Sequence, residues 1–261
     1  MDDNAMRFDD GARYERMMGR WSLLAGERFI DWLELPAGQR WLDVGCGTGA
    51  FTELLVRRCA PARVQAFDPA AGQLDFARQR LAPDAPVTWG EAGAEALPVA
   101  DAGADAAVMA LVLFFLPDPA AGVAEMCRAV RPGGSVAAYH WDMAGDGFPL
   151  ADLWHEMRAL DLPPRLPPSS DASTLAASAA LWEAAGLRRV RVTAISVQRH
   201  FESFEDYWVA AIGSNSLRPV LAAQSAERVE TLKSNVRRRI DPDGGAFSIN
   251  ARANAVCGVV G

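Results

Sequence analysis

The chain has 261 residues, of which 50% are hydrophobic and 23% charged, close to the averages of globular proteins. This length fits one full-size α/β domain, with or without a cap, and the composition argues against extensive disorder. The net charge of −7 at pH 7 excludes a general attraction for nucleic acid or for an anionic membrane. We therefore expect a globular enzyme that acts on a small molecule.

The cysteine spacing and the hydropathy of the chain indicate its cellular compartment. The four cysteines are far apart and form no C-x-x-C pair, so the pattern predicts neither a metal site nor a disulfide framework. Residues 1–11 are acidic and lack the apolar core of a signal peptide, and nowhere do 18 uncharged apolar residues run together. These features predict a cytoplasmic protein without stable membrane association.

The first helical pattern covers residues 12–35 and follows a short acidic tail. Its apolar residues recur at helical spacing, which predicts one or two helices packed on the edge of a sheet. The stripe consists of Tyr14, Met17, Met18, Trp21, Leu24, Phe29 and Trp32.

A glycine-rich turn at residues 45–49 organises the rest of the chain. The apolar run 41–44 predicts a buried strand, and core-facing spacing after Ala50 predicts a helix, so the turn joins a strand to a helix. Glycines allow positive φ and a close approach of a ligand, and the helix N-terminus supplies free N–H groups. The pattern G-x-G-x-x-A, followed by an acid at Asp68, also satisfies the dinucleotide fingerprint, so an NAD site is an alternative.

The next segment predicts a βαβ unit. Residues 63–67 form an apolar strand that ends at Asp68-Pro69, and residues 71–81 return to helical spacing. A right-handed crossover would place Asp68 at the same sheet edge as the glycine turn, where its carboxylate can accept both hydroxyls of a ribose. Asp68 is equally well placed to cap the following helix, and the two roles are compatible.

Three more strands complete the predicted parallel sheet. Residues 87–90 and 135–139 are short strands, and the apolar run 106–115 is typical of a central strand covered on both faces. We expect the C-terminal end of this central strand, near Ala110 and Leu111, to lie beside the glycine turn. A helix over 121–130 ends at the Pro-Gly-Gly turn before the fifth strand.

The second half of the chain is less regular. The spacing predicts helices over 150–160, 173–185, 204–212 and 219–239, a proline-rich linker over 163–168, and two alternating strands over 189–197 and 247–256. The candidate polar groups for a substrate are His140, Asp142, His155 and Tyr207. His140 is the candidate catalytic base, because a residue just past a central strand is expected to face the ligand.

Four motifs in order resemble class I S-adenosylmethionine-dependent methyltransferases of the UbiE-like, or methyltransferase type 11, group. They are Asp43 with the G-x-G-x-G turn, Asp68 after the second strand, Ala94-Glu-Ala-Leu-Pro98, and residues 125–134. The resemblance covers residues 41–142. Many members carry an Asp where this chain has Gly93, so the acid that the resemblance implies for the adenine amino group is missing there. The backbone N–H of Ala94 could still serve. Glu91 or Glu95 could replace the lost side chain, but surface exposure is the favoured interpretation for both.

The resemblance implies a fold and a set of site residues. The expected fold is a Rossmann-like, seven-stranded, mostly parallel sheet with helices on both faces, an antiparallel last strand and helical cap insertions. The implied cofactor is S-adenosyl-L-methionine, and residues before the first motif are implied to close over it. The expected cofactor-binding residues are Asp43, Gly45, Cys46, Gly47, Thr48, Gly49, Asp68, Pro69, Ala94, Glu95, Ala110 and Leu111, with Tyr14, Met18 and Arg20 as lid candidates.

We expect one methyltransferase domain over residues 1–261. Its parts are a helical lid over 1–40, a cofactor-binding core over 41–142, cap insertions over 143–186 and 200–240, and terminal strands over 187–199 and 246–258. The expected reaction is in-line methyl transfer to a small-molecule O, N, S or C nucleophile. The alternatives are a non-catalytic S-adenosylmethionine-binding protein and an NAD(P)-dependent oxidoreductase.

Overall fold

The computed structural model describes residues 18–162, 164, 166–213 and 217–261. Its strands belong to a single sheet. They are β1 (Arg40–Val44), β2 (Arg63–Asp68), β3 (Val87–Glu91), β4 (Ala104–Ala110), β5 (Val130–Trp141), β6 (Arg188–Phe201) and β7 (Phe247–Val259).

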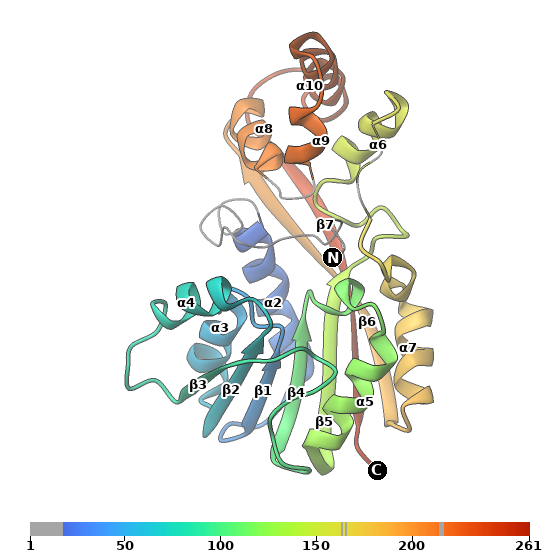
Figure 1. Ribbon diagram of the computed structural model, residues 1–261. Coiled ribbons are helices and arrows are strands. Elements are labelled where there is room, and N and C mark those ends of the chain that lie inside the picture. Colours follow the sequence, from blue (N-terminus) through green and yellow to red (C-terminus); the bar gives the residue numbers. More distant parts are fainter. Residues whose placement is uncertain (1–17, 163, 165, 214–216) are drawn as a thin grey trace.

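The seven strands lie in the order β3-β2-β1-β4-β5-β7-β6 (Figure 1). Strands β1 to β5 are parallel, whereas β7 runs antiparallel to both of its neighbours. The order reverses direction between β1 and β4, which is the switch point where ligands bind in open α/β sheets. The expected mostly parallel sheet with an antiparallel last strand is confirmed.

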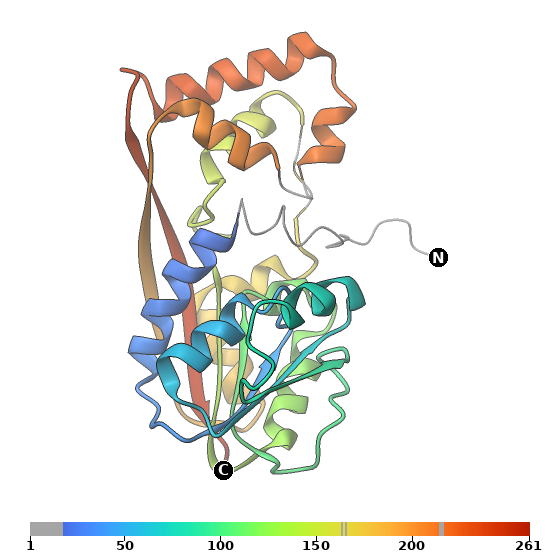
Figure 2. The ribbon, with the colours of Figure 1, turned by 90° about the vertical axis from the view of Figure 1, so that its left-hand side faces the viewer.

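Helices cover both faces of the sheet. The helices α2, α3 and α4 lie on one face, and α5 and α7 cover the other (Figures 1 and 2). The described helices are α2 (Arg20–Leu33), α3 (Ala50–Cys59), α4 (Ala71–Arg78), α5 (Pro119–Ala129), α6 (Ala151–Ala159), α7 (Leu175–Ala184), α8 (Phe204–Ile212), α9 (Arg218–Ala222) and α10 (Ala226–Ile240), with 3-10 turns η2 (Leu113–Phe115) and η3 (Ser170–Ser173).

The central strand predicted within the apolar run 106–115 ends where it was expected to end, because β4 stops at Ala110 and Leu111 takes a positive φ of 64° before η2. One predicted element differs in the structure. The single helix expected over 219–239 is two helices, since Ser225 has extended backbone and its side chain accepts a hydrogen bond from Arg228 N at 3.3 Å. That serine is the N-cap of α10.

The predicted Pro-Gly-Gly turn bulges out of β5. Val130 pairs with Ala104 and Ser135 pairs with Ala106, so residues 131–134 stand outside the regular register. The bulge is tied to the C-terminal end of β7 by Gly133 N, which donates to the carbonyl of Val260 at 2.9 Å. The turn signal in the sequence therefore corresponds to an irregularity at the start of a longer strand.

A cap stands over the carboxyl ends of the parallel strands. The pairing of β5 with β7 ends at Trp141 and Ala253, but β6 and β7 stay paired as far as Phe201 and Phe247. This ribbon of six further residues extends about 20 Å beyond the sheet. It carries α8, α9 and α10, and α6 lies beside them (Figure 1). By contrast, α7 lies within the same expected insertion as α6 but packs on the sheet.

An aromatic cluster packs α2 and α3 against β5. Phe29 of α2, Phe51 of α3 and Tyr139 of β5 pack together, with ring centroids 4.7 to 6.0 Å apart. The phenol of Tyr139 also donates to the carbonyl of Ser22 at 3.3 Å. These contacts hold α2 against β5 and against the start of α3. Among the described residues, no helix combines the length and apolarity needed to cross a membrane.

Candidate functional site

The glycine loop, residues 45–49, joins β1 to α3 at the carboxyl edge of the sheet. Gly45 has a φ of 76°, and a Cβ there would lie 2.5 Å from Cγ2 of Val112. Gly47 has a φ of 53°, and a Cβ there would have no neighbour within 4 Å. Gly45 is thus required by packing beneath the loop, whereas Gly47 borders open space where a ligand can approach.

Asp68 fixes the glycine loop to the end of β2. Its Oδ2 accepts a hydrogen bond from Gly47 N and its Oδ1 accepts one from Ala70 N, both at 2.9 Å. The carbonyl of Phe67 accepts from both Gly45 N and Cys46 N, at 2.8 and 2.9 Å. Each carboxylate oxygen keeps a second lone pair, so Asp68 can hold the loop and still accept ribose hydroxyls.

Burial raises the pKa of Asp68, and its two backbone hydrogen bonds oppose that rise. Asp68 was expected to cap the helix that follows β2, but it does so indirectly. Ala70 is the N-cap of α4, and Asp68 bonds to the Ala70 amide as an Asx turn that precedes the helix. Pro69, between them, is exposed.

Asp43 lies beneath the glycine loop and has no exposed surface. The hydroxyl of Thr52 donates to its Oδ2 at 2.6 Å. Burial raises the pKa of Asp43 to about 7, the charge of Asp68 adds to this rise, and the bond from Thr52 opposes it. The carboxyl is fully covered, so a ligand above the loop cannot touch it.

The remaining loop residues shape the site through backbone and packing. Cys46 is buried, and burial together with the charges of Asp43 and Asp68 raises the pKa of its thiol. Thr48 is also buried, and its carbonyl accepts a hydrogen bond from Nε of Arg80 at 2.9 Å. At Gly49, a Cβ would lie 2.9 Å from the ring of Trp89, so β3 also packs against the loop.

The ends of β3 and β4 complete this edge. Ala92 N donates to the carbonyl of Asp68 at 3.3 Å, which sets the loop after β3 beside the end of β2. Ala94 is buried and Glu95 is exposed. Leu111 N donates to the carbonyl of Tyr139 at 2.8 Å, while its positive φ turns the chain towards Val112 and the glycine loop. A positive φ in a leucine is uncommon and marks a constrained position.

The expectation that His140 faces the ligand is wrong. His140 has no exposed surface, and its Nε2 lies 2.9 Å from Oγ of Ser178 in α7. Burial lowers its pKa to about 4, against the opposing effects of the Asp142 charge and the Ser173 backbone. Side chains alternate along β5, so Tyr139 faces α2 and His140 faces the opposite layer.

The other polar candidates have different surroundings. Asp142 accepts hydrogen bonds from the guanidinium of Arg252 at 2.6 and 2.9 Å and from Gly145 N at 2.9 Å, which ties the start of the insertion to β7 and supports a structural role. Tyr207 is buried in the cap, with its ring centroid 5.4 Å from that of Phe201, and its hydroxyl has no hydrogen-bond partner among the described residues. His155 is exposed on α6.

The three lid candidates have different positions. Tyr14 lies outside the described residues. Met18 is buried in the hydrophobic core, whereas Arg20 is exposed in the first turn of α2. The charge of Arg20 acts on Arg199, in the part of β6 that extends beyond β5, so Arg20 lies on the cap side of α2.

Three contributors were missed by the sequence analysis. Thr52 bonds Asp43, Val112 packs on Gly45, and Trp89 packs on Gly49. A threonine on the otherwise apolar core face of α3 was a signal that a buried polar partner exists. No local pattern identified Val112 or Trp89, because both meet the loop through tertiary packing.

Residues 42–138 match the family model described as "Methyltransferase domain". The chain is 36% identical over 132 residues to the malonyl-[acyl-carrier protein] O-methyltransferase of Serratia marcescens, which covers 51% of this chain and 49% of that protein. It is 38% identical over 109 residues to the 2-phytyl-1,4-naphtoquinone methyltransferase of Thermosynechococcus vestitus, covering 41% and 48%. The chain thus spans about half the length of the curated relatives it matches.

Solved structures share the fold over most of the chain. Phosphoethanolamine N-methyltransferase 2 of Haemonchus contortus, in complex with S-adenosylhomocysteine, has a TM-score of 0.61 at 17% identity and covers 98% of this chain and 59% of that chain. A SAM-dependent methyltransferase from Aquifex aeolicus has a TM-score of 0.52 at 17% identity, with 93% and 98% covered. At sequence identities of 17%, the similarity to these structures establishes a shared fold and nothing more.

Proposed function

Because residues 42–138 form a class I S-adenosylmethionine-dependent methyltransferase domain, we propose that this protein transfers the methyl group of S-adenosylmethionine to a small-molecule acceptor. The observation that carries the proposal is the junction of the glycine loop with Asp68. One carboxylate holds the loop through Gly47 N and retains acceptor capacity for a ribose. Gly47 leaves open space beside it for the methionine part.

The residues present fit the cofactor by charge as well as by shape. S-adenosylmethionine supplies an electrophilic methyl group on a sulfonium, and its methionine end carries an ammonium. Asp43 lies beneath the loop, with its pKa raised by burial to about 7, so a cation placed over the loop would favour its ionised form. Thr52 keeps that carboxyl in place. We propose Asp68 for the ribose, and the loop after β3 for the adenine.

The proposed chemistry is an in-line displacement. A bond forms between the acceptor nucleophile and the methyl carbon as the bond from that carbon to sulfur breaks, and S-adenosylhomocysteine leaves. Alignment of two bound reactants can contribute roughly 7–11 kcal/mol, so a dedicated base is not obligatory. This agrees with the position of His140, which is buried against α7, and we assign it no base role.

For the methyl acceptor we propose a chemical class, a small molecule, and no individual compound. The named relatives act on different acceptors, and their similarity to this chain covers about half of it. The cap over the carboxyl edge, built from the β6–β7 ribbon and the helices it carries, is the part that we propose selects the acceptor. A small-molecule acceptor, the absence of a nucleic-acid partner and a cytoplasmic location stay predictions.

The test uses the purified full chain. Binding of S-adenosylhomocysteine is measured by calorimetry, and methyl transfer from labelled S-adenosylmethionine is measured across a panel of metabolites. Binding together with transfer to a small molecule supports the proposal. Binding without transfer to any acceptor would point to a non-catalytic cofactor-binding protein, and displacement of the ligand by NADH would point to an oxidoreductase.

A further inference from the structure

Strand β6 presents two arginines, Arg191 and Arg199, to the same side of the sheet. Side chains alternate along a strand, and both arginines stand at odd-numbered positions. The other residues at these positions in the second half of the strand are buried and apolar: Ile195, Val197 and Phe201. The guanidinium of Arg191 lies 4.2 Å from the ring centroid of Trp32. That of Arg199 lies 4.5 Å from the ring centroid of Phe201, so the two arginines are a matched pair.

Arg191 holds the C-terminal end of α2. Its Nη1 donates to the carbonyl of Trp32 at 2.8 Å, and its Nη2 donates to the carbonyl of Leu33 at 2.7 Å. The last carbonyls of a helix have no partner within the helix, and a cation is favoured beside them. The role of Arg191 is therefore structural.

Arg199 lies at the opposite end of α2. The pairing of β5 with β7 ends level with Ile195, so Arg199 stands four residues, or about 13 Å, beyond the sheet on the cap side. Figure 2 shows α2 beside the β6–β7 ribbon, with its first turn on the cap side. Burial lowers the pKa of Arg199, and the positive charge of Arg20 lowers it further. Two cations from different elements therefore converge between α2 and the cap.

Two converging guanidinium groups favour an oxyanion. Arg20 is exposed and Arg199 is half-buried, so the pair is open to solvent. A guanidinium that stacks on a ring through its face keeps N–H groups at its edge, and these match a carboxylate or a phosphate. An anion beside both arginines is attracted by two charges and offsets their mutual repulsion. Since the protein carries a net charge of −7, this attraction is local to the pair.

A buried hydroxyl continues this line of contacts into the cap. The ring of Tyr207 meets the ring of Phe201 edge-on, with centroids 5.4 Å apart. The hydroxyl of Tyr207 is buried and has no hydrogen-bond partner within the described part of the chain. Burial and the charge of Asp152 raise its pKa, so the hydroxyl keeps its proton and can donate. A buried hydroxyl without a partner is costly, and a ligand atom that accepts from it removes that cost.

We propose that Arg199 and Arg20 bind an oxyanion of the methyl acceptor, a carboxylate or a phosphate, and that the hydroxyl of Tyr207 donates to the same molecule. This inference rests on the proposed function and names the class of acceptor, an anionic molecule whose apolar part packs on the cap. Because Arg199 stands beyond the sheet, the oxyanion anchors the acceptor at the cap and does not itself receive the methyl group.

The first test uses the purified full chain, S-adenosylmethionine and acceptors in matched pairs. The pairs are carboxylic acids with their primary amides and phosphate monoesters with their free alcohols, each with a second nucleophile. We expect methyl transfer to an anionic member with a kcat/KM more than about tenfold above that of its neutral partner, as for a hydrogen bond to a charged group. The oxyanion should stay free in the product. Preference for neutral members, or methylation of the oxyanion itself, would overturn the inference.

The second test compares Arg199→Gln with Arg191→Gln on the anionic acceptor. Arg199→Gln should raise KM roughly fivefold to thirtyfold, as for a partly screened charged group, with kcat within about threefold. Its affinity for S-adenosylhomocysteine, measured by calorimetry, should stay at the wild-type level. Arg191→Gln should lower the unfolding temperature and leave KM unchanged. Unchanged KM in folded Arg199→Gln contradicts the inference, and a loss of S-adenosylhomocysteine affinity assigns the arginine to the cofactor's carboxylate instead.

Tyr207→Phe separates binding from packing, because it removes the hydroxyl and keeps the ring. Without ligand, the variant should unfold at the same temperature as the wild type or at a higher one, since an unpaired buried group is lost. KM for the anionic acceptor should rise roughly threefold to tenfold, as for one hydrogen bond. Unchanged KM would remove Tyr207 from the site. A wild-type protein that binds no S-adenosylhomocysteine, or that methylates no compound at all, would refute the proposed function instead.

Discussion

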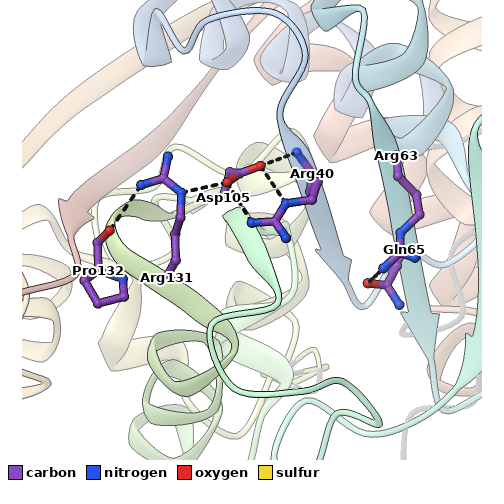
Figure 3. Close-up of polar contacts among 6 residues, drawn as sticks. All are labelled: Arg40, Arg63, Gln65, Asp105, Arg131 and Pro132. Carbon is purple, nitrogen blue, oxygen red and sulfur yellow. Dashed lines mark hydrogen bonds and ion pairs between the residues drawn. The ribbon is translucent and has the colours of Figure 1, made fainter.

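Acidic side chains have opposite surroundings at the two edges of the sheet. At the amino edge, where β1, β4 and β5 begin, Asp105 is held by two arginines (Figure 3). Arg40 donates from its backbone N at 2.8 Å and its Nε at 3.0 Å, and Arg131 donates from its Nε at 2.7 Å. These partners hold the pKa of Asp105 well below its usual range.

At the carboxyl edge, Asp43 and Asp68 are buried without such partners. Within the described part of the chain, neither has an ion pair with an arginine or lysine, and burial raises the pKa of both. An acid whose charge is already neutralised stabilises the fold, whereas an acid held by uncharged groups retains capacity for a cation or a hydroxyl. We propose that this difference separates the structural edge from the edge that binds the cofactor, and four variants test it.

The largest effect is expected from Asp68→Ala. Loss of both carboxylate oxygens removes the proposed ribose acceptors and the bond to Gly47 N, so S-adenosylhomocysteine should bind at least about 100-fold more weakly, as for two hydrogen bonds to a charged group. Calorimetry measures this. The control is Asp75→Ala on the exposed side of α4. Wild-type affinity in a folded Asp68→Ala protein would remove the ribose assignment.

Gly45→Ala should destabilise the fold more than Gly38→Ala. The two glycines have φ values of 76° and 77°, but only at Gly45 would a Cβ meet a neighbour, Val112, at 2.5 Å. Positive φ alone should cost about 1 kcal/mol at Gly38, and overpacking should bring the cost at Gly45 to about 2–4 kcal/mol. Denaturant unfolding measures both. Equal losses would show that Val112 moves aside freely.

Asp43 should make cofactor binding depend on pH. A bound cation favours the ionised carboxyl, so affinity for S-adenosylmethionine should rise up to about tenfold as the pH increases from 6 to 8 through the pKa of about 7. Asp43→Asn should flatten this profile. A profile unchanged by the substitution would assign the titration to another group.

The raised pKa of Asp43 also makes the free energy of unfolding depend on pH. Its folded pKa of about 7 exceeds its ordinary value of 3.8. The contribution to stability is therefore fully present below about pH 4 and is lost as the pH rises through about 7. Unfolding free energies of wild type and Asp43→Asn across this range provide a second measurement.

The smallest effect is expected from Asp105→Asn, and on stability alone. The side chains of Arg40 and Arg131 are 45% and 43% exposed, so solvent screening limits the loss at pH 7 to about 1 kcal/mol. Because the folded pKa is lowered, this contribution is present above about pH 4 and is lost as the pH falls through the folded value. S-adenosylhomocysteine affinity should stay at the wild-type level. A loss of affinity would mean that the two edges are coupled.

The cofactor half of the fold was predictable because its signals are local. Positive φ at Gly45 and Gly47, the apolar runs of β1, β2 and β4, and an acid at the end of β2 are properties of a few adjacent residues. Right-handed crossovers then place those residues on one edge. Such local rules identified the loop and Asp68 and led to the methyltransferase family.

By itself, the sequence determined the sheet, the position of the glycine loop and the class of cofactor. Only the tertiary structure decided that His140 faces α7 and that Val112 packs against Gly45. A central strand such as β5 is apolar on both faces, so no alternation of polarity indicates where His140 points. The cap depends likewise on a ribbon between strands more than 40 residues apart in sequence, a pairing that no local pattern encodes.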